Sequence, residues 1–334
     1  MRISLCEDLC PLLTTEVTDK LIANKVISVE DLVLCDLPKV RQISRQSDVH
    51  FQTLLDIRDQ LYTRFVAKPF NAFKLYNKTI SLKPLKTTIK NLDQMLPKGI
   101  PRGQVTQIYG ESGSGKTQFC YTLMASVAKL YGQRVLYFDT ELSFDSSRLI
   151  QIINNRFPAI NEQKLDQLLD YILVTRVFDL RSILDNIEAI DCDLQTNPLS
   201  EYKQLKLIII DSMSSPATLE MKKTNYKSNI QDQRANSSGA RKLHHQLKVR
   251  MTQMVTSLRA FAVKHSMAII VVNSQVMAKK YYWNNSCNTC LQFVRHNEDI
   301  NSKEITISLM QSYDTRADNH KSDNKFTISL KGIN

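Results

Sequence analysis

Glycine is scarce in this chain: there are eight glycines in 334 residues, and none lies within the first 64. Five of the eight fall between Gly99 and Gly115, within seventeen positions. Glycine is the residue that most easily adopts positive φ angles. The chain therefore needs unusual backbone geometry in that short stretch, and the first 64 residues are expected to form short helices.

Long apolar runs are also lacking. The longest are residues 207–210 and 267–272, far below the roughly 20 residues that a membrane helix needs. The first residues carry acids within their apolar stretch and show no clear signal-peptide cleavage site. Seven cysteines, an odd number, indicate reduced thiols and an intracellular protein. We therefore expect no association with a membrane.

A zinc site is disfavoured by what is missing around the one C-x-x-C pair. Cys287 and Cys290 have His296 nearby, but the sequence contains no second C-x-x-C and no H-x-x-x-H. A structural zinc site needs four ligands. The pattern therefore argues against zinc.

Acidic residues are nearly absent from one basic segment. Between Lys222 and Lys280 there are twelve Lys and Arg but only one acid, Asp232, so this segment accounts for the net charge of +11. A basic helix face exposed to solvent is the simpler explanation of such a run. A polyanionic partner is the alternative.

The first 84 residues are predicted to form a small helical domain, residues 1–64, and a linker, residues 65–84. Two segments, 13–26 and 28–40, have Ser or Thr start signals and apolar residues at three-to-four spacing, and residues 50–65 add a further helix. The linker mixes aromatics, lysines and two prolines without helical periodicity. Residues 85–334 are assigned to one larger domain.

From residue 85 onward, short β-branched runs alternate with helical patterns. The expected strands are residues 105–109, 134–139, 171–177, 206–211, 267–273, 305–310 and 326–330. Helices are expected over 116–132 and around 240–265. Nearly continuous apolar strands separated by helices predict an α/β fold with a mostly parallel sheet covered on both faces. The last two strands have no room for a helix between them and are expected to form an antiparallel edge.

Residues 110–117 read G-x-x-x-x-G-K-T, directly after a predicted strand and before a predicted helix. This context predicts a phosphate-binding loop, because glycines let successive N–H groups point at phosphate oxygens and the helix N-terminus adds positive charge. Lys116 is expected to reach the β- and γ-phosphates and Thr117 to ligate Mg²⁺. The expected nucleotide contacts are Gly110, Glu111, Ser112, Gly113, Ser114, Gly115, Lys116, Thr117 and Gln118.

Three polar residues follow other predicted strands. Asp211 ends an apolar run, and a carboxylate at that end of a parallel strand can hold Mg²⁺ opposite Thr117. Glu141 follows the strand 134–139 and fits either a base that activates water or an acid at the start of a helix. Gln275 follows the strand 267–273 and fits either a γ-phosphate sensor or a simple loop amide.

The order of these segments resembles the eukaryotic RecA-like recombinases and their paralogues. The resemblance rests on LDQMLPKGIPRGQVTQIYGESGSGKTQ, VLYFDTELSFDSSRL, KLIIIDS and VVNSQ, and it covers nearly the whole chain. The segments LCPLLTTEV, SVEDLV and FVAKPFNAFKLY are most similar to the delta type of paralogue, which belongs to a mediator complex. The resemblance implies a RecA-like P-loop ATPase core, ATP and Mg²⁺ as cofactors, and a nuclear protein of homologous recombination and double-strand-break repair.

The resemblance also implies roles for single residues. Glu141 and Gln275 match the family's catalytic glutamate and γ-phosphate-sensing glutamine, which with Lys116 make up the expected catalytic group. Arg148 matches a residue that lies against the adenine ring. Two DNA-binding loops are implied, and the residues expected to bind single-stranded DNA are Lys222, Lys223, Lys227, Arg234, Lys279, Lys280, Tyr281, Tyr282 and Trp283. Basic side chains bind the phosphates of the DNA backbone, while aromatic rings stack on the bases. The aromatic cluster of residues 281–283 equally fits packing against a partner subunit.

The sequence departs from the family pattern in ways that disfavour a long filament. The N-terminal domain lacks the glycine-bearing hairpin, and the linker lacks a strict F-x-x-A, with near-misses at Phe65–Ala67 and Phe70–Ala72. The second loop lacks glycines, and residues 312–323 lack a proline-containing cap. We therefore expect a small hetero-oligomer with other RecA-like paralogues. Two functions stay open: a weak, DNA-stimulated ATPase, or a scaffold subunit that holds ATP structurally at a subunit interface.

Overall fold

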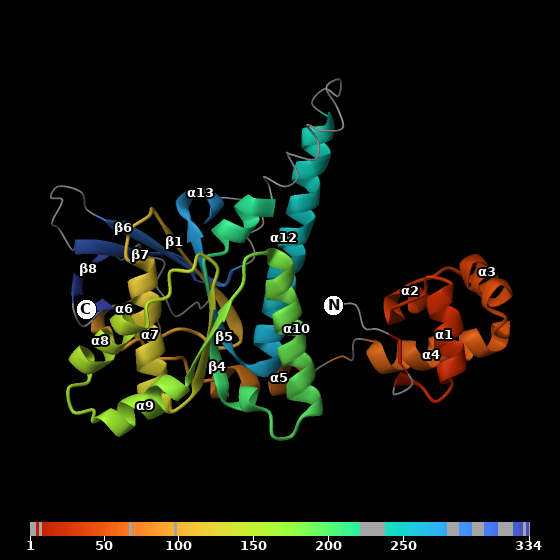
Figure 1. Ribbon diagram of the computed structural model, residues 1–334, viewed down its shortest axis with the longest axis horizontal. Helices are drawn as coiled ribbons and strands as arrows, with labels where there is room; N and C mark the ends of the chain where they lie inside the picture. The colour runs from red at the N-terminus through yellow and green to blue at the C-terminus, as the bar shows by residue number, and fades with distance from the viewer. Residues whose placement is uncertain are drawn as a thin grey trace. The chain divides into compact units, whose positions relative to one another are not determined.

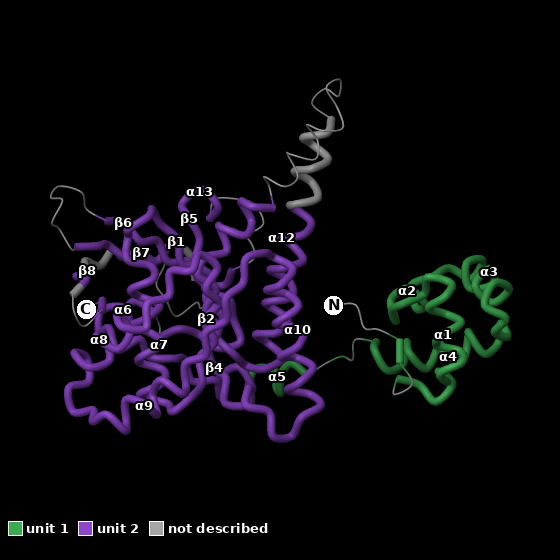
Figure 2. Tube along the Cα trace, viewed as in Figure 1, with its two compact units in different colours: residues 1–76 green, residues 77–334 purple. Residues whose placement is uncertain are grey.

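The computed structural model describes residues 5–6, 9–66, 69, 71–96, 99–220, 238–278, 287–295, 304–312, 323–329 and 332–333. The chain divides into two compact units, residues 1–76 and 77–334 (Figure 1 and Figure 2). Each unit is described by itself.

Among the described residues of the first unit, four α-helices pack around one apolar core. They are α1 (Thr15–Ala23), α2 (Val29–Val33), α3 (Leu37–Ser47) and α4 (Phe51–Phe65). Side-chain caps begin the first three: Thr14 accepts from Val17 N, Ser28 forms a capping box with Asp31, and Asp36 accepts from Lys39 N. Apolar residues at three-to-four spacing, such as Leu54, Ile57 and Leu61 of α4, are fully buried.

Residues 65–84, which we expected to form an irregular linker, contain a helix. This helix, α5 (Ala72–Ser81), has no buried residue. Four of its large apolar side chains are exposed: Phe73, Leu75, Tyr76 and Ile80.

The second unit is built on a nine-stranded sheet with the order β3-β2-β4-β5-β1-β6-β7-β8-β9. Its strands are β1 (Gln104–Gly110), β2 (Arg134–Asp139), β3 (Ile172–Arg176), β4 (Leu205–Asp211), β5 (Ala268–Ser274), β6 (Thr289–Arg295), β7 (Glu304–Ser312), β8 (Asp323–Ser329) and β9 (Gly332–Ile333). The first six in chain order pair in parallel, and β6 to β9 pair antiparallel. The expected α/β class with a mostly parallel sheet is confirmed.

Helices cover both faces of this sheet, as Figure 1 shows. They are α6 (Lys90–Met95), α7 (Lys116–Tyr131), α8 (Ser146–Arg156), α9 (Glu162–Asp170), α10 (Leu180–Thr196), α12 (Ser238–His265) and α13 (Gln275–Ala278), with a short 3₁₀ helix at Glu201–Gln204. Neighbouring residues of a strand point to opposite faces. Leu207 and Ile209 of β4 therefore pack in the core with α7 and α8, whereas Ile208 and Ile210 pack in the core with α10 and α12.

One expectation about these elements needs correction. The expected strands did not include β6, which pairs in parallel with β1 and so adds a strand before the antiparallel edge. In α7, Leu130 is 48% exposed. The helix is buried over nearly its whole circumference from Phe119 to Ala128, because the sheet, α8 and α9 surround it, and only its last turn leaves this contact.

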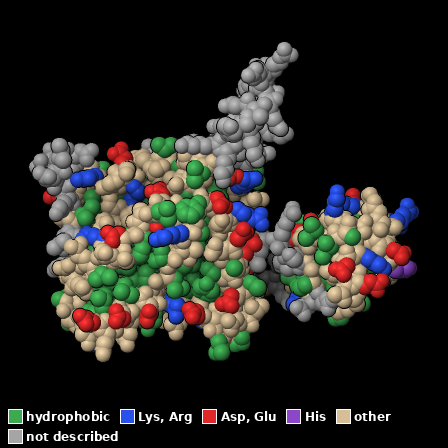
Figure 3. Space-filling model, in the orientation of Figure 1, with side chains coloured by type: hydrophobic (Ala, Val, Ile, Leu, Met, Phe, Trp, Pro, Cys, Tyr) green, Lys and Arg blue, Asp and Glu red, His purple; other side chains and the backbone are tan. Residues whose placement is uncertain are grey.

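None of the helices in the described residues has both the length and the hydropathy needed to cross a bilayer. The face drawn in Figure 3 carries acidic as well as basic side chains. Most of the basic surplus seen in the sequence belongs to residues 221–247 and 279–280, whose side chains lie outside those that the structure describes.

Candidate functional site

The phosphate-binding loop predicted from the sequence joins β1 to α7 at the carboxyl edge of the sheet. Gly113 and Gly115 have φ angles of 76° and 88°, which L side chains rarely adopt. Gly110 is required for a different reason: an added Cβ would lie 2.2 Å from the carbonyl oxygen of Phe293 on β6. The loop therefore depends on glycine both for its backbone angles and for its contact with β6.

The start of α7 concentrates positive charge on this loop. Gly115 is the N-cap and offers no side chain to the free N–H groups of the first turn. Lys116 Nζ donates to the carbonyl oxygens of Gly110 (2.9 Å) and Glu111 (2.6 Å). Burial lowers the pKa of Lys116, and the nearby Asp211 carboxylate opposes this effect. These groups together form a cradle of hydrogen-bond donors.

Asp211, at the end of β4, is joined directly to α7. Its Oδ2 accepts hydrogen bonds from Thr117 Oγ1 (2.8 Å) and from Tyr137 Oη (2.9 Å). Burial raises the pKa of Asp211, while these two hydrogen bonds favour the carboxylate and oppose the rise. Burial also raises the pKa of Tyr137, so this phenol remains a donor. Thr117 and Asp211 thus present a hydroxyl and a carboxylate side by side.

Glu141 lies near the same strand end and is held by a serine. Ser212 Oγ donates to Glu141 Oε1 at 2.7 Å, and Ser212 is itself fixed by two hydrogen bonds with Thr140 Oγ1. The loop that carries Glu141 is ordered by Asp139, whose carboxylate accepts from the backbone N–H groups of Glu141, Ser143 and Phe144. The glutamate is therefore positioned from two neighbouring strands, β2 and β4.

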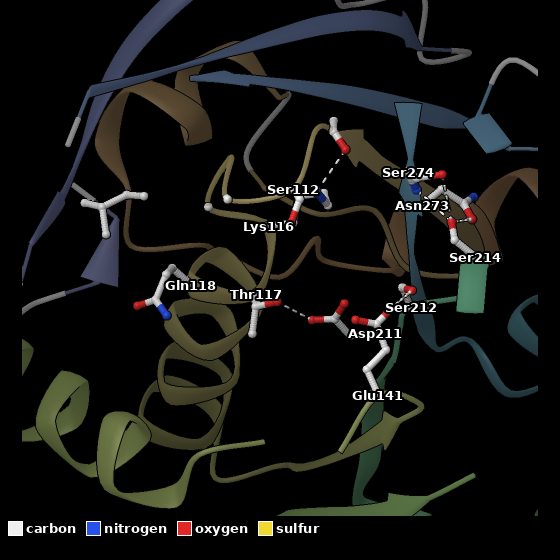
Figure 4. A pocket seen from close by; sticks show the side chains of 14 residues that line it. Ser112, Lys116, Thr117, Gln118, Glu141, Asp211, Ser212, Ser214, Asn273 and Ser274 are labelled. Atoms are coloured by element: carbon white, nitrogen blue, oxygen red, sulfur yellow. Dashed lines mark hydrogen bonds between the residues drawn. The ribbon is translucent and has the colours of Figure 1, made fainter. Parts of the chain in front are cut away.

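A pocket of about 360 Å³ gathers these groups (Figure 4). Its lining residues are Gly110, Ser112, Gly113, Gly115, Lys116, Thr117, Gln118, Glu141, Asp211, Ser212, Ser214, Asn273, Ser274 and Ile328. Nine of the residues predicted from the sequence are thus brought together: Gly110, Ser112, Gly113, Gly115, Lys116, Thr117, Gln118, Glu141 and Asp211.

Four predicted residues do not line the pocket. Glu111 and Ser114 bond to each other within the loop, where Ser114 Oγ donates to the Glu111 carbonyl oxygen at 2.8 Å. Arg148 Nε donates to Gln118 Oε1 at 2.8 Å and so contacts a lining residue. Gln275 is half-buried at the start of α13, one residue beyond the lining Ser274. The predicted DNA contacts in 222–234 and 279–283 lie outside the described residues.

Sequence reasoning missed five lining residues: Ser212, Ser214, Asn273, Ser274 and Ile328. The first four carried a usable signal, because they are polar residues at or just beyond the ends of two buried parallel strands, where ligands bind in such sheets. Ile328 of β8 carried none, because only the tertiary fold brings it to Gly115.

These residues fit a nucleoside triphosphate with magnesium. The glycine cradle and the uncapped N-terminus of α7 suit phosphate oxygens, and Lys116 adds a cation. The Thr117 hydroxyl and the Asp211 carboxylate are oxygen ligands of the kind that Mg²⁺ prefers. Glu141 supplies a carboxylate on the same pocket wall as Asp211.

Comparison with known proteins agrees with this geometry. The chain is 35% identical over 208 residues to DNA repair protein RAD51 homolog 4 of Bos taurus, and 34% identical over 208 residues to the protein of that name from Mus musculus; each match covers 62% of this chain and 62% of the relative. It is 32% identical over 203 residues to DNA repair and recombination protein RadA of Cenarchaeum symbiosum, covering 58% of this chain and 48% of the relative.

The chain thus spans somewhat less than two thirds of the length of the RAD51 homolog 4 proteins that it matches. The sequence profile of the Rad51 family matches residues 78–289, well over half of the chain, and includes the phosphate-binding loop, Glu141 and Asp211. On this match, the chain belongs to the Rad51 family.

Proposed function

We propose that the chain is an ATP-hydrolysing Rad51-family paralogue of the delta type that acts in homologous recombination and double-strand-break repair. Membership in the Rad51 family implies ATP binding. The names of the bovine and mouse relatives, DNA repair protein RAD51 homolog 4, support the choice of paralogue and of process. A nuclear location follows from this role.

The observation that carries the catalytic part of the proposal is the convergence of Lys116, Thr117, Asp211 and Glu141 on one pocket. Bound ATP would supply the terminal phosphoryl group, and Thr117 and Asp211 would hold a magnesium ion that neutralises charge on its phosphates. Lys116 stabilises negative charge on the phosphates. Glu141, oriented by Ser212, takes the proton of the attacking water as general base. Gln275 responds to the γ-phosphate, and Arg148 lies against the adenine ring.

Turnover is expected to be slow and to depend on partners. The four exposed apolar side chains of α5 support a contact with another RecA-like paralogue, because apolar surface gains free energy when a partner covers it. We further propose that residues 1–64 and the linker 65–84 serve this assembly, while residues 85–334 bind nucleotide. We assign the binding of single-stranded DNA to the basic residues of 222–234 and to residues 279–283.

The test compares two substitutions in the pocket with a matched control. Lys116→Ala should abolish binding of Mg-ATP, measured by calorimetry on the full chain with its partners. Glu141→Gln should still bind, because the amide can accept the hydrogen bond from Ser212, but it should not release phosphate. Lys129→Ala changes an exposed lysine of the same helix and should match the parent in both assays. Hydrolysis by Glu141→Gln at the parent's rate would remove Glu141 from the mechanism.

A second function is a scaffold that holds ATP at a subunit interface without hydrolysing it. The exposed apolar face of α5 favours it, since it points to assembly rather than to turnover. The two functions differ in one measurement. A parent protein that binds Mg-ATP, and that releases no phosphate even with partners and DNA, would be the scaffold.

A further inference from the structure

Three polar side chains form a hydrogen-bonded group on the pocket wall that lies away from the phosphate-binding loop (Figure 4). Ser214 Oγ accepts from the backbone N–H of Ser274 at 2.7 Å. The same hydroxyl lies 3.4 Å from Asn273 Oδ1 and 3.3 Å from Ser274 Oγ. Ser274 Oγ in turn accepts from the backbone N–H of Met277, at 3.3 Å. The group therefore reaches from the end of β4 into α13.

Asn273 is the member of this group with an unmet hydrogen bond. Its side chain is 0% exposed, and its Nδ2 has no hydrogen-bond partner within the described part of the chain. A buried donor without a partner costs about 1–3 kcal/mol. Asn273 also lines the pocket. An oxygen acceptor that reaches this amide, such as a phosphate oxygen, would remove this cost.

Ser214 makes the side-chain link between two chain segments where the sheet ends. The β4–β5 ladder runs from Leu207–Ala268 to Ile210–Val271, and one further main-chain bond follows, from Met213 N to Val272 O at 2.9 Å. Beyond it, the connection between the two segments passes through the Ser214 hydroxyl. The Ser214 hydroxyl therefore ties Asn273 and Ser274, and with them the start of α13 and Gln275, to the end of β4.

We propose that Asn273 and Ser214 act as a phosphate-responsive clamp. The Asn273 amide donates to an oxygen of the terminal phosphate, and Ser214 transmits its position to the backbone of Ser274 and so to α13. Both are positioning residues, because neither acts on the water or on the phosphoryl bond. The proposal rests on the nucleotide-binding part of the proposed function, but it requires neither DNA binding nor hydrolysis.

Hydrogen–deuterium exchange of the full chain tests the clamp. Exchange is followed at residues 273–278 with ADP and with a non-hydrolysable ATP analogue, each with Mg²⁺ and at a concentration that saturates each variant. In the parent, the analogue should slow exchange at residues 273–278 about tenfold relative to ADP. This is about the factor expected when one additional hydrogen bond opposes the local opening of the segment. Ser214→Ala should lose this difference, and Ser214→Thr, which keeps the hydroxyl, should restore it.

Thr218→Ala is the matched control, because Thr218 Oγ1 donates to the Ser214 carbonyl oxygen at 2.7 Å without taking part in the clamp. It should respond to the analogue like the parent. Asn273→Leu, which lacks the amide, should lose the response as Ser214→Ala does. A full response in Ser214→Ala, or its loss in Thr218→Ala, would overturn the clamp. If the parent binds the analogue without any change in exchange, the clamp alone fails; if it binds no analogue, nucleotide binding fails as well.

Discussion

Tyr137 provides a sharp test of the electrostatics described for Asp211. Its ring is fully buried, and its hydroxyl donates to Asp211 Oδ2 at 2.9 Å. Tyr137→Phe removes this hydrogen bond and keeps the ring, which packs against Tyr121 and Phe144 with centroids 6.1 and 5.4 Å away. The substitution therefore isolates one bond to a buried carboxylate.

The expected loss of stability follows from the charge on the acceptor. A hydrogen bond to a charged group contributes about 1.5–3 kcal/mol to the free energy of unfolding. For a domain of 150–250 residues, close to the size of the core, each kcal/mol shifts Tm by about 2–4 °C. Tyr137→Phe should therefore lower the Tm of the core by about 3–12 °C at a pH where Asp211 is ionised.

The pH dependence gives the sign of the effect. Burial raises the pKa of Asp211, so the folded state holds this proton more tightly than the unfolded state, and the contribution of Asp211 to stability falls as pH rises from its ordinary pKa to the raised one. The bond from Tyr137 favours the carboxylate and limits this rise. Without it the pKa of Asp211 moves higher still. The difference in Tm between parent and variant should thus be small below the ordinary pKa and grow as pH rises through the raised one.

Scanning calorimetry from acidic to alkaline pH measures the difference in Tm between the parent and Tyr137→Phe. Tyr121→Phe is the matched control. Tyr121 is as buried as Tyr137, but its hydroxyl bonds to the backbone of Ser143 and Asp145 rather than to Asp211. The control should lose stability by an amount that does not change with pH. A Tyr137→Phe variant with the parent's Tm at every pH, or a control with the same pH dependence, would refute the electrostatic account of Asp211.

Two further predictions concern the loop and the DNA contacts. Gly110→Ala should cost about 1–3 kcal/mol or more, because its Cβ would clash with the β6 backbone, and should lose Mg-ATP binding. Gly132→Ala also places a side chain at a positive φ, 56°, but its Cβ would meet Tyr171 Oη at 3.8 Å without a clash, so this variant should keep binding. Reversing the charge of Lys279 and Lys280 should reduce the slope of log K against log salt for single-stranded DNA by about 1.4, as expected for two lost phosphate contacts. An unchanged slope in a filter-binding titration would exclude this segment.

The central strands and the loop could be predicted because their signals are local. Four of the five central parallel strands, β1, β2, β4 and β5, are segments of six or seven residues rich in β-branched, aliphatic and aromatic side chains, and the glycine spacing of residues 110–117 carries its own chemistry. Thr117 and Asp211 could be paired in advance because the carboxyl ends of parallel strands share one edge.

Other features could not be predicted because they depend on which strands become neighbours. Strand β6 has no continuous β-branched run. Its place is set by pairing with β1, in which Thr289 lies opposite Thr106, 183 residues earlier in the chain. The bond between Ser214 and Ser274 joins residues 60 positions apart, and it exists only because β4 lies next to β5. Tyr137 looked like any core aromatic until the structure placed its hydroxyl on Asp211.

The position of β1 between β5 and β6 has a consequence for the newborn protein. The ribosome makes residues 104–110 early, yet both strands that flank them, residues 268–274 and 289–295, emerge much later. Until then the glycine loop has no sheet to hold it, and contacts between such distant residues form slowly. The nascent chain should therefore acquire nucleotide affinity abruptly, once residues 268–295 have left the ribosome, so ATP binds the folded domain and does not guide its folding.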